Sequence, residues 1–487
     1  MSMDQLLLLL PALVVTATTV LCMLAVAIHR RHLVSCVISA VGLLLALLSL
    51  SVAMPLAPQE VTPLLRVDAF SLFFTVLVLG SALVVTLFSY PYLCNLEDQQ
   101  DEFYLLLNIS VLGALVMVSS THFLTAFLGM ETLSVCLYGM VAYPLHRSRT
   151  AQYPMEASLK YLVLSAVSSG FVLFGMALLY AQSGTLHFTD ISAGLAGGAL
   201  VPASYYVLAS LLIIMGFAFK LSLVPFHLWT PDVYEGAPLP ATSFLATVGK
   251  LAMAALLMRF MSVSELLSSA DIRYVLSIIA VFSILFGNLL ALRQSNLKRL
   301  LSYSSIAHMG YLLVALITLN ATGQSLGAEA VSFYLTAYVV MSLGAFGVMT
   351  VVSDSAQERD HIGHYQGLFW RNPWLALVFT AMLLSLAGIP LTIGFVGKFY
   401  IFAAGVQGAE WMLLLAMVVG SGIGLFYYLR IVYRMLAPLE HHDPFPEAGL
   451  RELLPHGLLL CLLVLLVLPG VLPGGLMALV ETVVRSL

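Results

Sequence analysis

The 487-residue chain is 61% hydrophobic and only 9% charged, with a formal net charge of −4 at pH 7. Because soluble domains carry about 25% charged residues, this composition excludes an ordinary soluble enzyme and indicates a protein that is solvated by lipid. The small net charge excludes no class of partner.

Apolar runs follow one another along the chain, separated by short polar loops or by proline and glycine. Since a membrane-spanning helix needs about 20 mostly apolar residues, we predict an all-α polytopic membrane protein with about fourteen transmembrane helices. The first run, Leu6 to Ile28, has no preceding basic region and no cleavage pattern, so it is interpreted as a retained helix. The helix centres are expected near residues 17, 43, 82, 111, 133, 168, 214, 250, 283, 309, 340, 390, 423 and 460.

Basic residues favour one orientation of these helices. If the N-terminus faces away from the cytoplasm, only Arg66, Arg259 and Arg273 lie on the outer side. The cytoplasmic loops and helix ends then contain Arg30, Arg31, Arg147, Arg149, Arg293, Lys298, Arg299, Arg359, Arg371, Arg434 and Arg451. This excess satisfies the positive-inside rule and predicts that both termini are periplasmic. Lys298 and Arg299 are interpreted as cytoplasmic-side anchors.

The seventh and twelfth runs each contain a proline, Pro225 in KLSLVPFHLW and Pro390 in SLAGIPLTIGF. Proline removes an amide donor, and lipid cannot satisfy the freed backbone groups, so discontinuous helices 7 and 12 should line a polar pathway. The two breaks are five helices apart, which inverts one relative to the other. The segments 157–175 and 330–348 also align loosely, which favours inverted repeats around a transport site.

Three of the five lysines fall deep inside apolar runs: Lys220, Lys250 and Lys398. Each costs about 2.5 to 3.5 kcal/mol at the bilayer centre, so a neutral residue would be favoured unless the amine has a function. Glu131, in FLGMETLSV, is interpreted as the one deeply buried acid, and Lys220 is its expected partner. If the carboxylate moved away, burial would favour release of a proton from the lysine.

Two histidines extend this set. His308 lies in the middle of the tenth run and could relay protons between Lys250 and Lys398, and His227 follows the Pro225 break. Structural ion pairing is the alternative for Lys220, Lys250 and Glu131. A structural or interfacial role is favoured for His227, and also for Lys160 and Glu156.

Motifs for cofactors are missing from the sequence. The five cysteines stand singly, the twelve histidines form no HExxH motif, and no glycine-rich phosphate loop or dinucleotide fingerprint occurs. We therefore predict no metal, nucleotide or redox cofactor in this chain.

Long segments resemble the antiporter-like membrane subunits of respiratory complex I: FLGMETLSVCLYG, EASLKYLVLSAVSSGFVLFGMALLYAQSG, GFAFKLSLVPFHLWTPDVYEGAPLPATSFLATVGK, NLKRLLSYSSIAHMGYLLVAL and LSLAGIPLTIGFVGKFY. The resemblance implies one integral membrane domain, 1–487. Helices 1–3 would occupy 1–102, a five-helix repeat 103–261, a second, inverted repeat 262–437, and helix 14 with the C-terminus 438–487.

The resemblance also implies roles. Glu131 would be the helix-5 glutamate, Lys220 its helix-7 partner, Lys250 the central helix-8 lysine, and Lys398 the helix-12 lysine on the exit side, with His308 on the central axis. Protons would be the transported ion in a bacterial inner membrane, driven by quinone reduction elsewhere. FMN, iron–sulfur clusters and quinone would lie in partner subunits, with subunit M and the small subunit K as neighbours.

The chain ends soon after the fourteenth run, without the lateral helix of the largest antiporter-like subunit, so we expect it not to be that subunit. Phospholipids are expected around it, and no nucleic acid. An alternative is a Na⁺/H⁺ antiporter or membrane-hydrogenase-type subunit, which would use the same buried lysines and glutamate. A structural scaffold would not explain three buried lysines.

Overall fold

A computed structural model describes residues 2–94, 100–143, 152–191, 203–264, 266–319, 326–353, 358–438 and 453–487. Arg147, Arg149 and Arg451 lie outside these ranges. The elements are α1 (Met3–Leu8), α2 (Leu10–Ile28), α3 (His32–Ala53), η1 (Met54–Leu56), β1 (Gln59–Thr62), β2 (Leu65–Val67), α4 (Ala69–Leu93), α5 (Glu102–Ser119), α6 (Phe123–Ala142), α7 (Gln152–Ser183), α9 (Ala203–Lys220), α10 (Trp229–Gly236), α11 (Leu239–Phe244), η2 (Leu245–Gly249), α12 (Lys250–Val263), η3 (Leu266–Ser268), α13 (Ala270–Leu292), α14 (Leu297–Ile317), α15 (Leu326–Val352), η4 (Ile362–Tyr365), α16 (Leu368–Arg371), α17 (Pro373–Ala387), α18 (Ile393–Gln407), α19 (Trp411–Leu436), α20 (Leu453–Val471) and α21 (Gly474–Val484).

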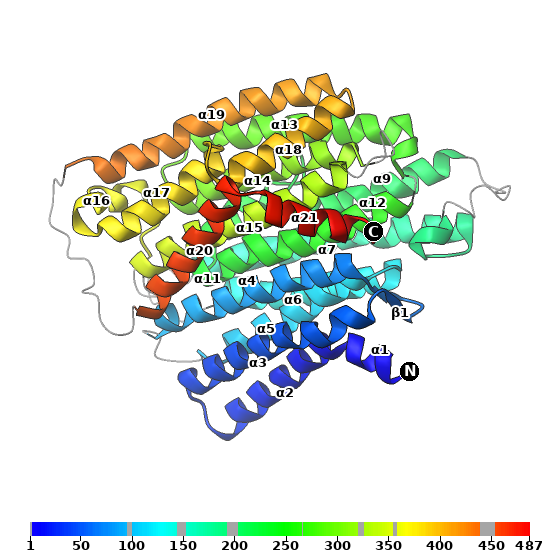
Figure 1. Cartoon of the computed structure of the whole chain (residues 1–487), viewed down its shortest axis with the longest axis horizontal. Helices are drawn as coiled ribbons and strands as arrows, with labels where there is room; N and C mark the ends of the chain where they lie inside the picture. The colour runs from blue at the N-terminus through cyan, green and yellow to red at the C-terminus, as the bar shows by residue number, and fades with distance from the viewer. Residues whose placement is uncertain are drawn as a thin grey trace.

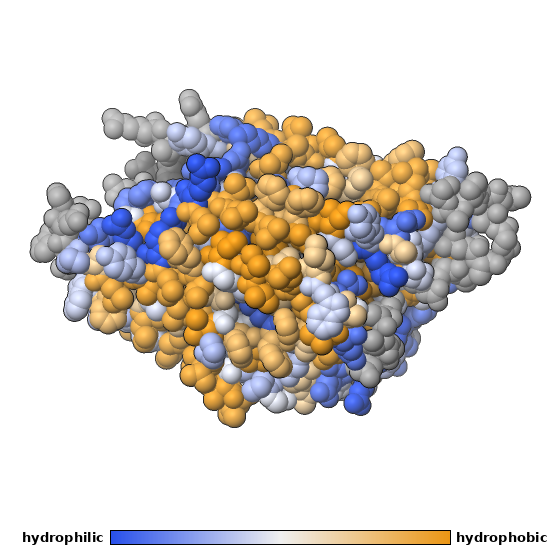
Figure 2. All heavy atoms as spheres, turned by 90° about the horizontal axis from the view of Figure 1, so that it is seen from above, coloured by the Kyte–Doolittle hydropathy of each residue, from blue (hydrophilic) through white to orange (hydrophobic). Residues whose placement is uncertain are grey.

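Most helices lie side by side along one common direction (Figure 1). In the described ranges, twelve helices are long and apolar enough to cross a membrane, judged by length and composition. Large apolar side chains are exposed along α2, α3, α7, α13 and α19, and Figure 2 shows an apolar belt between more hydrophilic ends. This belt is what a polytopic membrane protein presents to lipid or to neighbouring subunits.

The molecule has two polar edges, at the two ends of its helices. The terminal edge carries both chain termini and the antiparallel hairpin of β1 and β2, which the sequence pattern did not predict. The basic edge carries the start of α14 and residues 358–362, which pair through an isolated bridge from Asn296 to His361. Two other details differ from expectation: the first run is interrupted at Leu9, and the short helix α21 follows the last long helix.

Both predicted helix breaks are present. The chain between α9 and α10 includes Ser222 at φ 63°, and the chain between α17 and α18 includes Gly388 at φ 89°. Helix ends leave carbonyl groups without partners, and lipid cannot supply donors. At the first break the indole of Trp229 donates to the carbonyl of Phe219 at 3.0 Å. At the second break Lys398 supplies the donor, as described below.

Candidate functional site

Lys220 is the last residue of α9 and lies buried at the first break. Its Nζ donates to the hydroxyls of Ser134 on α6 and Ser165 on α7, each at 2.6 Å. The hydroxyl of Tyr138 donates to Ser165 at 2.6 Å, which extends this polar group. The broken helix therefore directs its lysine toward two hydroxyl groups of neighbouring spans.

Glu131 differs from the sequence-based interpretation in two respects. Its side chain is only half-buried, whereas Asp68 is fully buried at the start of α4. Glu131 also forms no direct ion pair with Lys220; its Oε1 accepts a hydrogen bond from Ser169 at 2.5 Å. Ser169 lies one turn beyond Ser165 on α7, so two serines stand between the carboxylate and the lysine. A run of apolar residues around an acid indicates membrane depth but not which way the side chain points.

Lys250 is almost completely buried and follows the π-helical turn η2 directly. Such turns inside helices are frequent at functional sites. The Nζ of Lys250 donates to the hydroxyl of Ser305 on α14 at 2.5 Å and lies 5.7 Å from the ring centre of Tyr234. Ser305 is itself hydrogen-bonded to the hydroxyl of Tyr338 on α15 at 2.5 Å.

His308 lies one turn beyond Ser305 on α14 and is almost completely buried. Its Nδ1 is 2.5 Å from the hydroxyl of Tyr334 on α15, and its Nε2 is 3.3 Å from the hydroxyl of Tyr428 on α19. Tyr428 also hydrogen-bonds Ser304. Because hydroxyls and a neutral imidazole both donate and accept, this group can pass a proton in either direction.

Lys398, near the start of α18, is the third of the three lysines that lie deep in apolar runs. Its Nζ donates to the carbonyls of Leu386 and Ala387, the last residues of α17, at 3.0 and 2.9 Å, and to the hydroxyl of Ser421 at 2.9 Å. It also lies 5.2 Å from the ring centre of Tyr311. The amine thus satisfies the free carbonyls of the interrupted helix, at the end where the helix dipole is negative.

His227 is not connected to these three lysines. It lies in the first break and is buried, but its Nδ1 has no hydrogen-bond partner, and no hydrogen bond joins its side chain to the lysines within the described ranges.

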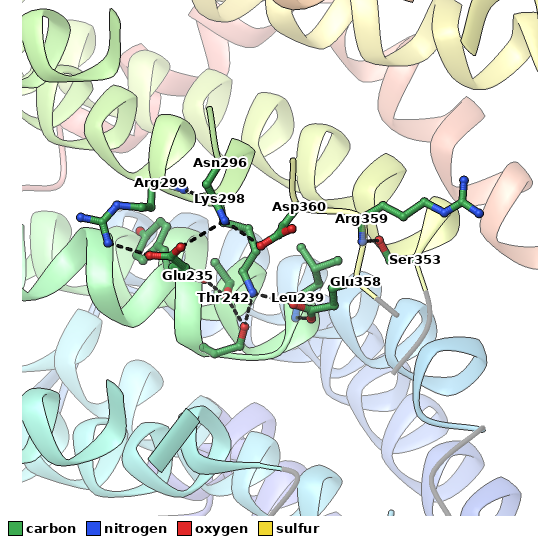
Figure 3. A network of polar contacts seen from close by, with 12 residues as sticks. Glu235, Leu239, Thr242, Asn296, Lys298, Arg299, Ser353, Glu358, Arg359 and Asp360 are labelled. Atoms are coloured by element: carbon green, nitrogen blue, oxygen red, sulfur yellow. Dashed lines mark hydrogen bonds and ion pairs between the residues drawn. The ribbon is translucent and has the colours of Figure 1, made fainter. Parts of the chain in front are cut away.

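Lys298 is not the surface anchor that its position suggests. Its side chain is fully buried, and its Nζ donates to Glu358 at 2.8 Å and to the carbonyl of Ala237 at 2.6 Å (Figure 3). Glu358 also accepts from the backbone N–H of Leu239, the first residue of α11, at 3.0 Å, and from the hydroxyl of Tyr92. This ion pair therefore ties together the basic-edge ends of α4, α11 and α14.

Arg299 belongs to the same edge. Its guanidinium pairs with Asp232 at 2.8 Å and with Glu235 at 2.6 Å, both on α10. Asp232 also accepts from Lys160 of α7 at 2.9 Å. The second half of the first broken helix, α10, is therefore held to α7 and to α14.

A second buried ion pair lies at the terminal edge. Arg259 of α12 donates to both carboxylate oxygens of Asp68, at 2.9 and 2.7 Å, and both side chains are buried. The positive-inside pattern placed Arg259 at a helix end but gave no sign of this partner. Among the residues that the structure covers, no group of three or more His, Cys, Asp or Glu side chains could hold a metal ion.

Comparison with known proteins identifies the family. Residues 120–424 match the family model described as NADH:quinone oxidoreductase/Mrp antiporter, TM. NADH-quinone oxidoreductase subunit N of Ectopseudomonas mendocina is 48% identical over 98% of this chain and 96% of the relative.

Two solved structures share the fold. A chain of respiratory complex I from Thermus thermophilus, solved with bound aureothin, has a TM-score of 0.81 and 32% identity over 96% of this chain and 98% of its own length. A chain of the Mrp complex from Dietzia sp. superposes with a TM-score of 0.86 over 100% and 97% of the two chains, but at 18% identity this likeness concerns the fold alone. The chain therefore belongs to the NADH:quinone oxidoreductase/Mrp antiporter family, and within that family to subunit N of the NADH-quinone oxidoreductases.

Proposed function

We propose that this chain is a proton-translocating membrane-arm subunit of NADH:quinone oxidoreductase. Protons would move along the row of Glu131, Lys220, Lys250, His308 and Lys398, driven by quinone reduction in other subunits. His227 would lie at the first break without being part of the row.

One observation carries this proposal. In the described part of the chain, the amines of Lys220, Lys250 and Lys398 bond only to hydroxyls or backbone carbonyls, and no carboxylate lies within ion-pair distance. A buried lysine that serves stability alone would have a counterion, as Lys298 has Glu358. Without one, the balance between charged and neutral amine is free to respond to small changes nearby.

Serine hydroxyls lie beside the amines and beside the carboxylate of Glu131. Ser165 and Ser169 stand between Glu131 and Lys220, and Ser305 bonds Lys250. A shift of Glu131 toward Lys220 would stabilise the ammonium, and its withdrawal would favour proton release. Release from one lysine would in turn change the field at the next, since opposite and like charges act over several ångströms in a medium of low dielectric.

The proposal includes two inverted five-helix repeats, 103–261 and 262–437. Two matching backbone pairings support it. His122 pairs with His187 beside the start of α6, and Asn296 pairs with His361 beside the start of α14. Both residues of the second pair lie 174 positions after the corresponding residues of the first pair. The hydrogen bonds repeat as well: Phe123 N–H to Leu186 and Leu297 N–H to Asp360. The first pairing lies on the terminal edge and the second on the basic edge, as inversion requires.

Counting α9 with α10, and α17 with α18, as two interrupted spans gives the fourteen helices of the proposed topology, in one domain of residues 1–487. Helices 1–3 then fall in 1–102 and helix 14 in 438–487. The basic edge carries Arg293, Lys298, Arg299, Arg371 and Arg434, which supports a cytoplasmic assignment for it. Both termini would then be periplasmic, in a bacterial inner membrane.

Subunit M and the small subunit K are the proposed neighbours of this chain. FMN, iron–sulfur clusters and the quinone site would lie in other subunits of the complex. A Na⁺/H⁺ antiporter is the second candidate, because the family model covers both classes. The extent of identity with a subunit N favours the redox complex. Purification of the chain from its native membrane separates the two: NADH dehydrogenase activity and iron–sulfur signals accompany it only in the first case.

The row is tested with Lys220→Ala and Glu131→Ala in the assembled complex. Both should lower NADH-driven proton uptake by inverted vesicles, and turnover with it where coupling is tight, without preventing assembly. Lys160→Ala is the control, because Lys160 is half-exposed in an ion pair with Glu156 and Asp232. It should have the milder effect. Undiminished proton uptake in well-assembled Lys220→Ala and Glu131→Ala complexes would remove both residues from the pathway.

A further inference from the structure

Three arginines gather where α13 and α19 reach the basic edge: Arg293, Arg430 and Arg434. Arg430 donates to the carbonyls of Leu292 at 2.9 Å and Gln294 at 2.6 Å, which flank Arg293. Its Nε is buried and has no hydrogen-bond partner in the described ranges. Arg434 lies one turn further along α19, on the same side as Arg430, and both Arg293 and Arg434 are exposed.

No carboxylate neutralises this cluster within the described residues. None of the three guanidiniums takes part in an ion pair there, whereas Lys160, Lys298 and Arg299 on the same edge each contact at least one acid. Like charges one helical turn apart repel each other. Within the described residues, the cluster is therefore a concentration of positive charge that would bind an anion.

The surroundings of the cluster are those of a membrane interface. Trp370 is 64% exposed, and its indole donates to the carbonyl of Leu436 at the end of α19. Tyr433 is 70% exposed, between Arg430 and Arg434 in sequence. Exposed tryptophan and tyrosine mark the level of lipid headgroups. Toward the membrane centre the same two helices expose Phe286 and Phe426.

We propose that Arg293, Arg430 and Arg434 bind the headgroup of an anionic phospholipid in the leaflet of the basic edge. Its phosphate would accept charge-assisted hydrogen bonds from the exposed guanidiniums of Arg293 and Arg434, and Arg430 behind them would add positive charge. Its acyl chains would lie along the apolar surfaces of α13 and α19. An acidic segment of a neighbouring subunit would meet the same charge, but the apolar surface directly below the cluster fits a headgroup joined to acyl chains.

The test uses the whole complex, purified in detergent and depleted of lipid. Phosphatidylglycerol is added back, and bound phospholipid is counted by native mass spectrometry. The double variant Arg430→Gln/Arg434→Gln should bind the tightest phosphatidylglycerol about 25-fold more weakly, because each arginine near a membrane surface contributes roughly a factor of five. Arg273→Gln is the matched control, since Arg273 is exposed at the opposite end of α13. It should bind like the parent complex.

Further binding experiments identify the ligand. Phosphatidylcholine should not replace phosphatidylglycerol, and inorganic phosphate should not compete at equal concentration; either result to the contrary would overturn the assignment to an anionic lipid. Loss of a neighbouring subunit from the double variant, with phosphatidylglycerol binding unchanged, would show a protein contact instead. If the double variant fails to assemble, Arg434→Gln alone serves, because its side chain is exposed. Unchanged lipid binding in that variant would equally contradict the proposal.

Discussion

Lys298 and Lys250 are both almost completely buried, yet their partners differ in kind. Lys298 has a carboxylate at 2.8 Å, and Lys250 has the hydroxyl of Ser305 at 2.5 Å. A carboxylate holds an ammonium charged, whereas a hydroxyl can donate to a neutral amine or accept from a charged one. The sequence pattern ranked these residues by depth alone, and it therefore missed the burial of Lys298. Partners determine which buried lysine is able to change its charge.

The pair of Asp68 and Arg259 gives a prediction about stability at the residue scale. Arg259→Ala should destabilise the folded chain by up to about 3–5 kcal/mol, because the buried carboxylate of Asp68 loses its buried guanidinium and keeps only the partly exposed Arg66, at 3.5 Å. Removing both charges in Asp68→Ala/Arg259→Ala should cost less than the sum of the single changes. The order of these effects is measured by thermal unfolding of the purified complex, with loss of this subunit as the signal. Additive losses would show that the two side chains do not act as a pair.

A second prediction at this scale concerns Lys298. Lys298→Met should lower the assembly or thermal stability of the complex, because Glu358 would remain buried without its cation, and Glu358→Gln in the same chain should restore part of that stability. In complexes that do assemble, proton uptake per NADH should stay near the parent value. A selective loss of proton uptake at normal stability would instead place Lys298 in the proton path.

Prolines within apolar runs predicted the two interrupted helices correctly, since Pro225 and Pro390 both lie where a helix stops. Proline alone does not decide, however, because Pro91 lies inside α4 without interrupting it. The difference is the surroundings: at both breaks a side chain, Trp229 or Lys398, satisfies the carbonyls that the break exposes. Such partners come from distant positions in the chain and are not readable from the local sequence.

Gly388 gives a prediction at the scale of elements. It has φ 89°, and a Cβ there would meet Cδ of Lys398 at 2.9 Å. Gly388→Ala should cost about 1–2 kcal/mol through backbone strain alone and should also displace the lysine, so proton uptake should fall. Gly422→Ala is the control, because a Cβ at position 422 meets nothing within 4 Å. Equal proton uptake in the two variants would mean that the position of Lys398 is unimportant.

At the scale of the whole molecule, the apolar runs carried most of the information about the fold. The expected centres agree with the centres of the observed helices to within a few residues, because a helix that crosses the hydrocarbon layer needs a long apolar run. The hydroxyls of the row were not predicted: Ser165, Ser305 and Tyr334 resemble the many other serines and tyrosines of these helices. Only the packing of α7, α14 and α15 against the lysine-bearing segments singles them out.

The proposed orientation can be measured in intact cells. Ser2 is exposed on the terminal edge and Ser295 on the basic edge. A membrane-impermeant maleimide added to cells with a permeable outer membrane should label Ser2→Cys directly, and Ser295→Cys only after the inner membrane is opened. The parent chain, with its five cysteines, gives the background. The reverse pattern would place both termini in the cytoplasm.

The proposed proton pathway is tested most directly with the reconstituted complex that carries Lys250→Ala. The quantity measured is the number of protons moved per NADH oxidised. In the proposed pathway Lys250 stands between Lys220 and Lys398, so its loss should lower proton movement, and coupled turnover with it, in a complex that assembles normally. Proton movement per NADH equal to that of the parent complex, at equal turnover, would contradict the account.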